Sequence, residues 1–243
     1  MKHSLPIRAA VLAAVAIPLV ACSAIPVPPE GLTEDWVPSA SPSAIDPDLL
    51  DSPLGFEPEQ RSAVRIRNSK CDELSSGSGF ILDAHTIVTN RHVVEGFLEL
   101  EVNTSDGRDI TVASTSTSPV SDIAIITTVE SLEPFVSLAY LDPTLGDFVT
   151  IVGFPLGEQM TTTTGSILER SSDDLDNADH VFITSAQSEH GSSGSAVYDE
   201  EGKVFGVLYA GQDDTKYSII IPISIVKESL SSLDPLAAVK ECT

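Results

Sequence analysis

A serine in a glycine-flanked turn is the residue of this chain best suited to act as a nucleophile. Ser193 lies in the Gly-Ser-Ser-Gly-Ser run at 191–195, directly before the apolar segment 196–198. Glycine accepts backbone dihedrals that a side chain forbids, so neighbouring N–H groups can converge on one point beside the serine. A hydroxyl next to such donors can attack a carbonyl carbon while the donors stabilise the oxyanion that forms. An ordinary turn is the alternative interpretation, because Ser and Gly are common turn residues.

A histidine and an aspartate earlier in the chain could activate that hydroxyl. His92 stands where the predicted strand 86–89 ends and apolar residues resume, and Asp122 directly precedes the predicted buried strand 123–128. A partly desolvated carboxylate at the rim of a sheet needs a partner. Taken singly, His92 could be a structural histidine and Asp122 could simply begin its strand. Taken together with Ser193, they predict a centre in which Asp122 orients His92 and His92 accepts the serine proton.

The other histidines are assigned different places. His190 adjoins the serine turn, but it directly precedes a glycine, so it is predicted to line a substrate cleft rather than to act as the base. The remaining three lie in an N-terminal export segment, at a turn and at the start of a strand: His3, His85 and His180.

The elements that must position these groups are predicted to be strands. Short segments rich in Val, Ile and Thr are separated by Gly, Asp, Asn, Ser and Pro, which is typical of barrels or sandwiches rather than alternating β-α units. After Pro222, apolar residues at helical spacing predict a C-terminal helix. The predicted strands are 63–67, 79–82, 86–89, 98–102, 123–128, 148–152, 161–168, 180–184, 196–198, 204–209 and 217–221. The fold is therefore predicted to be all-β with one C-terminal α-helix.

Composition and charge limit the partners. The 243-residue chain is 42% hydrophobic, which permits a sizeable core, and residues 61–243 have the length of one domain. Its formal net charge of −23 excludes a nucleic-acid-binding protein, which needs a basic surface.

The first 21 residues are predicted to be an export signal. Lys2 and Arg8 precede a short apolar run at 9–21, which is too short to span a bilayer. The sequence Leu-Val-Ala-Cys at 19–22 resembles the lipobox of bacterial lipoproteins, which implies that Cys22 is acylated and holds the protein on the outer face of the bacterial cytoplasmic membrane. A plain cleaved signal with an incidental cysteine is the alternative.

Residues 22–60 are predicted to be a disordered tether. From 23 to 60 there are eight prolines and eight acidic residues but no Lys or Arg. Such a segment cannot bury enough apolar surface to offset the entropy lost on ordering.

Two cysteines are left once Cys22 is assigned to lipid. An even remainder in an exported chain favours a disulfide between Cys71 and Cys242. Two free thiols are the alternative.

Taken together, the motifs resemble the trypsin-like (chymotrypsin-fold) serine proteases, nearer the bacterial HtrA-type and glutamyl-endopeptidase-type domains than the digestive enzymes. The resemblance covers about residues 62–233. Its six motifs occur in order at 77–80, 89–94, 121–124, 153–157, 191–195 and 206–208.

The resemblance implies two antiparallel six-stranded β-barrels, with the site in the cleft between them. His92 and Asp122 would come from the first barrel and Ser193 from the second. The N–H groups of Gly191 and Ser193 would form the oxyanion hole, and no cofactor or metal would be needed.

The resemblance also implies a substrate-binding strand and pocket. Residues 209–211, with Tyr209 and Gly211 at their ends, would pair with the substrate backbone as an added strand. Gln187 stands where trypsin carries an acidic residue, so a preference for Lys or Arg has no charged pocket floor.

These inferences predict a membrane-anchored extracytoplasmic serine endopeptidase that acts on proteins or peptides through an acyl-enzyme. Two alternatives stay open. The chain could be a catalytically silent binding lipoprotein on a protease scaffold, or an esterase that uses the same nucleophile.

Overall fold

The computed structural model describes residues 56–71, 73–172, 180–212 and 217–237. All described residues belong to one compact unit, Asp46–Thr243. The predicted signal peptide, Cys22 and Cys242 lie outside the described residues. Within the described ranges, no helix has the length and apolar character needed to cross a membrane.

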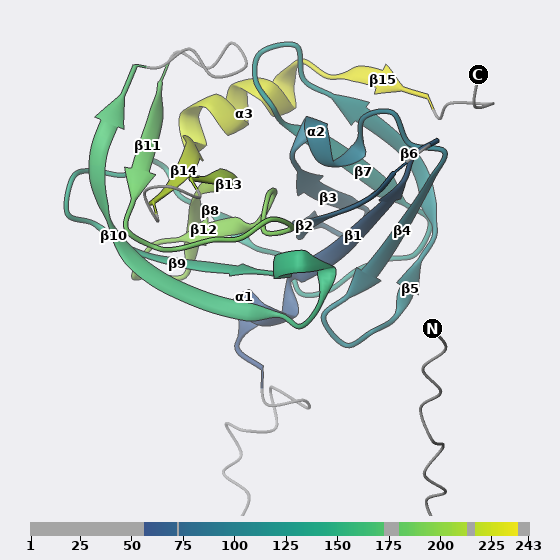
Figure 1. The fold of residues 1–243 in the computed structure, drawn as a ribbon, viewed down its shortest axis with the longest axis horizontal. Coiled ribbons are helices and arrows are strands. Elements are labelled where there is room, and N and C mark those ends of the chain that lie inside the picture. Colours follow the sequence, from purple (N-terminus) through teal and green to yellow (C-terminus); the bar gives the residue numbers. More distant parts are fainter. Residues whose placement is uncertain (1–55, 72, 173–179, 213–216, 238–243) are drawn as a thin grey trace, which may run out of the picture. The chain divides into compact units, whose positions relative to one another are not determined.

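The first half of the described chain forms an open half-barrel (Figure 1). Its strand order is β15-β6-β7-β3-β2-β1-β4-β5, and all neighbouring strands pair antiparallel. The strands are β1 (Ala63–Ser69), β2 (Leu74–Asp83), β3 (Thr86–Thr89), β4 (Glu99–Thr104), β5 (Asp109–Ile110), β6 (Val112–Thr117), β7 (Ala124–Thr128) and, from the end of the chain, β15 (Asp234–Leu236).

The second half closes into a six-stranded barrel. Strand β12 pairs with both β9 and β13, which joins the two ends of the order β12-β9-β10-β11-β14-β13. A short strand, β8, adds to β13 in parallel. The strands are β8 (Ser137–Leu138), β9 (Phe148–Gly153), β10 (Thr161–Ser171), β11 (Val181–Thr184), β12 (Ala196–Tyr198), β13 (Lys203–Gln212) and β14 (Tyr217–Pro222). The all-β prediction is confirmed.

Short helical segments connect and flank the strands in the described part of the chain. The predicted C-terminal helix is α3 (Ile223–Ser231), which follows Pro222 as expected. Two turns not predicted from the sequence are α2 (Arg91–Val94) and the 3-10 segment η3 (Pro155–Gly157).

Helix α1 (Pro58–Arg61) corrects the predicted boundary of the tether at residue 60. Glu57 is its N-cap and Pro58 opens it, a position at which the missing proline N–H costs nothing. The side chain of Gln60 binds back to the N–H of Glu57 at 3.0 Å. The last residues of the predicted tether are therefore part of the folded unit.

One of three buried apolar clusters in the described residues joins the two barrels. Phe80 and Val88 of the half-barrel pack in one buried cluster with Val152 and Ala196 of the closed barrel. All four side chains are at most 1% exposed. Because buried apolar surface stabilises by about 25 cal/mol per Å², this shared cluster holds the two barrels in a fixed relation. The residues at their seam are therefore held in place by packing as well as by hydrogen bonds.

Candidate active site

His92 and Asp122 are in direct contact. The Nδ1 atom of His92 lies 2.5 Å from Oδ2 of Asp122, and the backbone N–H of His92 donates to Oδ1 at 2.9 Å. The Asp122 side chain is 3% exposed, whereas the His92 side chain is 46% exposed. The buried carboxylate therefore fixes both the backbone and the ring of a histidine whose other face is open to solvent.

The local structure around Asp122 explains this geometry. Asp122 lies two residues before β7, which begins one residue later than the predicted strand 123–128, and its backbone carbonyl accepts a bond from the Asn90 side chain at 2.8 Å. The Nε atom of Arg91 lies 3.8 Å from Oδ1 of Asp122, which places a positive charge beside the buried carboxylate. The turn that begins α2 is thus attached to Asp122 through Asn90, Arg91 and His92.

Ser193 lies on a loop from the closed barrel that reaches the half-barrel. Gly191 and Gly194 have φ values of +89° and +88°, which L side chains rarely adopt. A Cβ on Gly194 would lie 2.2 Å from the carbonyl oxygen of Ser78 and 3.2 Å from the N atom of Asn90. The loop therefore packs directly against the residues that lead into α2, on which His92 sits.

The imidazole of His92 also contacts the closed barrel. Its ring and that of Tyr209 meet edge to face, with centroids 5.8 Å apart. Among the described residues, no hydrogen bond joins His92 to Ser193. Hydrogen bonds of this kind are often long in ligand-free enzymes and tighten when substrate binds.

The backbone donors expected for an oxyanion hole are not used elsewhere. The N–H groups on either side of them are bonded: Ser192 donates to Glu189, Gly194 to Leu208 and Ser195 to Ser192. In the part of the chain that the structure describes, the N–H groups of Gly191 and Ser193 donate to no acceptor. Two free donors at alternate positions of one turn can bind a single oxygen.

Ser78 is a residue at the site that the sequence analysis did not single out. Its buried hydroxyl donates to the carbonyl of Gly191 at 2.8 Å and accepts from the N–H of Phe154 at 2.9 Å. Its backbone N–H donates to the carbonyl of Ser193 at 2.8 Å. One side chain of the half-barrel thus orients the loop that carries Ser193. The sequence signal was a small polar residue between two glycines at 77–79.

Comparison with known proteins identifies the family. The sequence profile of the family described as "Trypsin-like peptidase domain" matches residues 77–207. This chain belongs to the trypsin-like peptidase domain family. The match includes parts of both barrels and all three residues of the predicted centre.

Individual relatives agree with this assignment. The chain is 28% identical over 208 residues to the serine protease Rv3671c of Mycobacterium tuberculosis, covering 81% of this chain and 51% of the relative. It is 30% identical over 178 residues to the periplasmic serine endoprotease DegP of Escherichia coli, covering 69% of this chain and 37% of DegP. The chain therefore spans about half or less of the length of these relatives.

Solved structures support the same fold. The crystal structure of the active form of the Rv3671c protease from M. tuberculosis aligns with a TM-score of 0.66 at 26% identity, covering 80% of this chain and 89% of that one. The HtrA-type protease AlgW with a tripeptide aligns with a TM-score of 0.62 at 24% identity, and it shows the fold alone.

The residues predicted to bind substrate lie around the loop at 191–195. Tyr209 and Gly211 are on β13, and the pairing of β13 with β14 shifts register between Leu208 and Ala210. A β-bulge of this kind redirects a side chain, and here the ring at position 209 contacts His92. Gln187 and His190 are exposed on the segment leading to the loop. No ligand contact tests these four assignments, so they stay predictions.

The remaining predicted sites are only partly described. Cys71 is disulfide-bonded in the structure. Because Cys22 and Cys242 lie outside the described residues, lipidation and the pairing of Cys71 with Cys242 stay predictions. Within the described ranges, no group of three or more His, Cys, Asp or Glu side chains could hold a metal ion.

Proposed function

We propose that this chain is a serine endopeptidase in which Ser193, His92 and Asp122 form the catalytic triad. The observation that carries the proposal is the contact of a buried carboxylate with a half-exposed imidazole at the point where the glycine-flanked serine loop meets α2. Membership of the trypsin-like peptidase domain family supports the same assignment.

The proposed reaction follows from the geometry of these groups. Oγ of Ser193 attacks the carbonyl carbon of the substrate, and Nε2 of His92 takes the hydroxyl proton. Asp122 holds the proton on Nδ1 of His92 and stabilises the imidazolium. The C–N bond of the tetrahedral intermediate breaks as His92 returns the proton to the leaving amine. Water then repeats the sequence on the acyl-enzyme and frees Ser193.

The proposed oxyanion hole consists of the N–H groups of Gly191 and Ser193. The charge that develops on the substrate oxygen is stabilised in the transition state, where one such donor contributes about 10²–10³ in rate. Ser78 positions this turn through the Gly191 carbonyl. We assign the backbone at 209–211 to the binding of an extended substrate, with Gln187 and His190 beside the pocket.

The test is labelling of the full chain with a fluorophosphonate, which forms a covalent bond only with an activated serine. The wild-type chain should be labelled, and both Ser193→Ala and His92→Ala should abolish labelling. Ser192→Ala, a change at the neighbouring hydroxyl, should leave it intact. A folded wild-type chain that takes up no label would favour a silent binding protein.

A second measurement separates peptide from ester hydrolysis. Unlabelled wild-type enzyme is incubated with a peptide library and with an activated ester, and products are followed by mass spectrometry. Cleavage of internal peptide bonds that is lost in Ser193→Ala supports an endopeptidase. Turnover of the ester alone would replace the proposal with an esterase.

We also propose that the enzyme acts outside the cytoplasm, held by lipid at Cys22. The division proposed is a signal peptide at 1–21, a tether that follows it, and a protease domain that begins near α1 and includes residues 61–243. The support is the lipobox-like sequence at 19–22 and the periplasmic relative DegP. Cys22→Ser should move the protein from the membrane fraction to the soluble fraction.

A further inference from the structure

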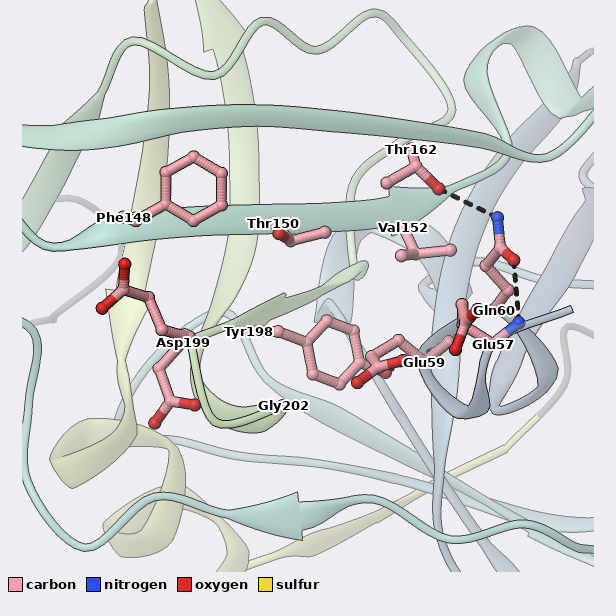
Figure 2. A pocket seen from close by; sticks show the side chains of 11 residues that line it. Glu57, Glu59, Gln60, Phe148, Thr150, Val152, Thr162, Tyr198, Asp199 and Gly202 are labelled. Atoms are coloured by element: carbon pink, nitrogen blue, oxygen red, sulfur yellow. Dashed lines mark hydrogen bonds between the residues drawn. The ribbon is translucent and has the colours of Figure 1, made fainter. Parts of the chain in front are cut away.

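Two hollows meet on the surface of the closed barrel, and neither contains a residue of the proposed triad. The first has a volume of about 470 Å³ and lies between α1, β9 and the turn from β12 to β13 (Figure 2). The second, of about 390 Å³, lies beside it along the segment that leads into β9. Both are lined by Phe148, Asp199 and Glu200, so they form one continuous surface, here called the acidic groove.

The floor of the acidic groove is apolar and exposed. Phe148 is 41% exposed although it lies within a strand of a barrel, and Tyr140 and Leu141 of the second hollow are 90% and 72% exposed. Figure 2 shows the ring of Phe148 on β9, with Val152 farther along the strand and the ring of Tyr198 on the facing side. Neighbouring exposed apolar side chains of this size are typical of an interaction surface.

The walls of the groove are rigid. Tyr198 is 2% exposed, and its hydroxyl bonds to Oγ of Ser62 at 2.8 Å. The side chain of Gln60 on α1 donates to Oγ1 of Thr162 on β10 at 3.2 Å, which ties the helix to the barrel (Figure 2). Asp199 accepts from the N–H groups of Glu201 and Lys203 at 2.9 Å each and so fixes the β12–β13 turn. The groove therefore exists before any partner binds.

The charge of the groove is almost entirely negative. Four acids, Glu57, Glu59, Asp199 and Glu200, line the first hollow, and its lining includes no Lys, Arg or His. The lining of the second hollow adds a single cation, Lys203, whose Nζ is already 2.6 Å from Glu201. A second cation, Lys227, lies beside this hollow, with Nζ bonded to the Ala139 carbonyl at 2.6 Å and 5.6 Å from the centroid of the Tyr140 ring.

Three of these carboxylates have no charged partner. Within the described part of the chain, Glu57, Glu59 and Glu200 make no ion pair. Unpaired carboxylates around exposed apolar side chains are complementary to a ligand that is both cationic and apolar.

The charge also decides against two other occupants. Residues 23–55 of this chain carry six acidic residues and no Lys or Arg, so the groove would repel that segment. A second copy carries the same net charge of −23 and would be repelled as well. A single small cation would fill one hollow, whereas two adjoining hollows match an extended ligand with two apolar side chains.

We propose that the acidic groove is a docking site for a basic, amphipathic peptide segment of a partner protein. Lysine or arginine side chains of that segment pair with Glu57, Glu59 and Glu200, and its apolar side chains cover Phe148 in one hollow and Tyr140 in the other. The site is separate from the proposed triad, so it can be tested by binding alone.

The experiment measures fluorescence anisotropy of a short labelled peptide that alternates lysine and leucine. The full chain with Ser193→Ala is used throughout, so that cleavage of the probe cannot interfere. Saturable binding is expected. Phe148→Ser and Glu200→Gln should each weaken binding about tenfold, which corresponds to about 1.4 kcal/mol.

Matched variants outside the groove distinguish this site from general attraction to an acidic protein. Phe135→Ser changes another exposed phenylalanine, and Glu169→Gln another exposed glutamate. Both should bind the probe as tightly as the parent, and circular dichroism should show that all four variants are folded. A peptide in which serine replaces leucine should bind about tenfold more weakly.

Either of two results would overturn the proposal. One is the absence of saturable binding by the lysine-leucine peptide. The other is equal binding by groove and control variants, or by the leucine and serine peptides, because the interaction would then depend on net charge and not on the groove.

Discussion

The half-barrel and the closed barrel hold their parts of the proposed site in different ways. The half-barrel keeps His92 and Asp122 in contact through two hydrogen bonds within its own sheet and turn. The closed barrel presents Ser193 on a loop whose position depends on bonds across the seam, chiefly those of Ser78. Changes where the two barrels meet should therefore leave the contact of His92 with Asp122 intact. The same changes should displace Ser193.

The largest loss of activity is expected when the hydrogen bond between His92 and Asp122 is disrupted. Asp122→Asn replaces the acceptor of the Nδ1 proton by an amide that favours the wrong tautomer of His92, and kcat should fall about 10⁴-fold. Stability should change much less, because the new side chain has nearly the same shape. Steady-state hydrolysis of a peptide substrate measures the loss. Asp83→Asn, an exposed aspartate before β3, should retain full activity.

The next effect comes from pushing the nucleophile loop away from the half-barrel. In Gly194→Ala the new Cβ would meet the Ser78 carbonyl at 2.2 Å in a backbone with φ of +88°. Displacement of the oxyanion donors should lower kcat by about 10²–10³.

Gly107→Ala is the matched control for that change. Gly107 has a similar φ of +84° but no heavy atom within 4 Å of an added Cβ. The added side chain strains a backbone with positive φ, so the free energy of unfolding should fall by about 1–3 kcal/mol, as measured by thermal unfolding. The activity should not change. Equal loss of activity in both variants would contradict the importance of contact at the seam.

A smaller effect is expected when the bond across the seam is removed. Ser78→Ala leaves the carbonyl of Gly191 and the N–H of Phe154 without the serine hydroxyl, at a cost of about 1–3 kcal/mol in stability. Because Ser78 acts by positioning the turn, kcat should fall about tenfold while KM stays nearly constant.

Ser62→Ala removes a hydrogen bond from an equally buried serine that bonds to Tyr198 and not to the loop at 191–195. It should cost similar stability with unchanged kcat. If both serine variants had the same kinetics, Ser78 would have only a structural role.

The smallest effect concerns the closed barrel alone and appears at alkaline pH. Burial raises the pKa of Tyr198 above its ordinary value of 10.0. The folded state therefore holds the proton more tightly than the unfolded state. This contribution to stability is complete below the ordinary pKa and is lost as the pH rises above it, by up to about 1.4 kcal/mol per pH unit.

Urea unfolding over that alkaline range measures this dependence. Tyr198→Phe should lose this part of the pH dependence, and Tyr140→Phe, an exposed tyrosine, should retain it. Identical slopes in all three proteins would show that burial of Tyr198 does not control alkaline stability.

Much of the fold could be predicted because its strands have a strong local pattern. The predicted strands at 86–89 and 196–198 match β3 and β12 at both ends, and α3 begins after Pro222. Strand β6 was missed because Val112–Thr117 is mostly polar and largely accessible, and only Thr115 is buried. Its strand conformation depends on pairing with β7, which no local pattern records.

The candidate site was also predictable only in part. Residue type and order were enough to propose His92, Asp122 and Ser193 as the triad, because hydrolytic chemistry requires those groups with glycines around the nucleophile. The role of Ser78 could not be predicted, since it arises from hydrogen bonds to residues 113 and 76 positions away in the chain. The acidic groove was also invisible, because α1 lay within a segment predicted to be disordered.

The sequence by itself determined which groups this protein has available for chemistry, since those are side-chain identities, and it indicated the strands that have a local apolar pattern, such as β3 and β12. Only the tertiary structure decided which of these groups meet. Pairing of β12 with both β9 and β13 closes one barrel, whereas the eight-stranded sheet stays open. Residues that are about a hundred positions apart in the chain meet where the two pack together. The physical reason is that burial of one shared core, and not any local preference, fixes how the two barrels pack.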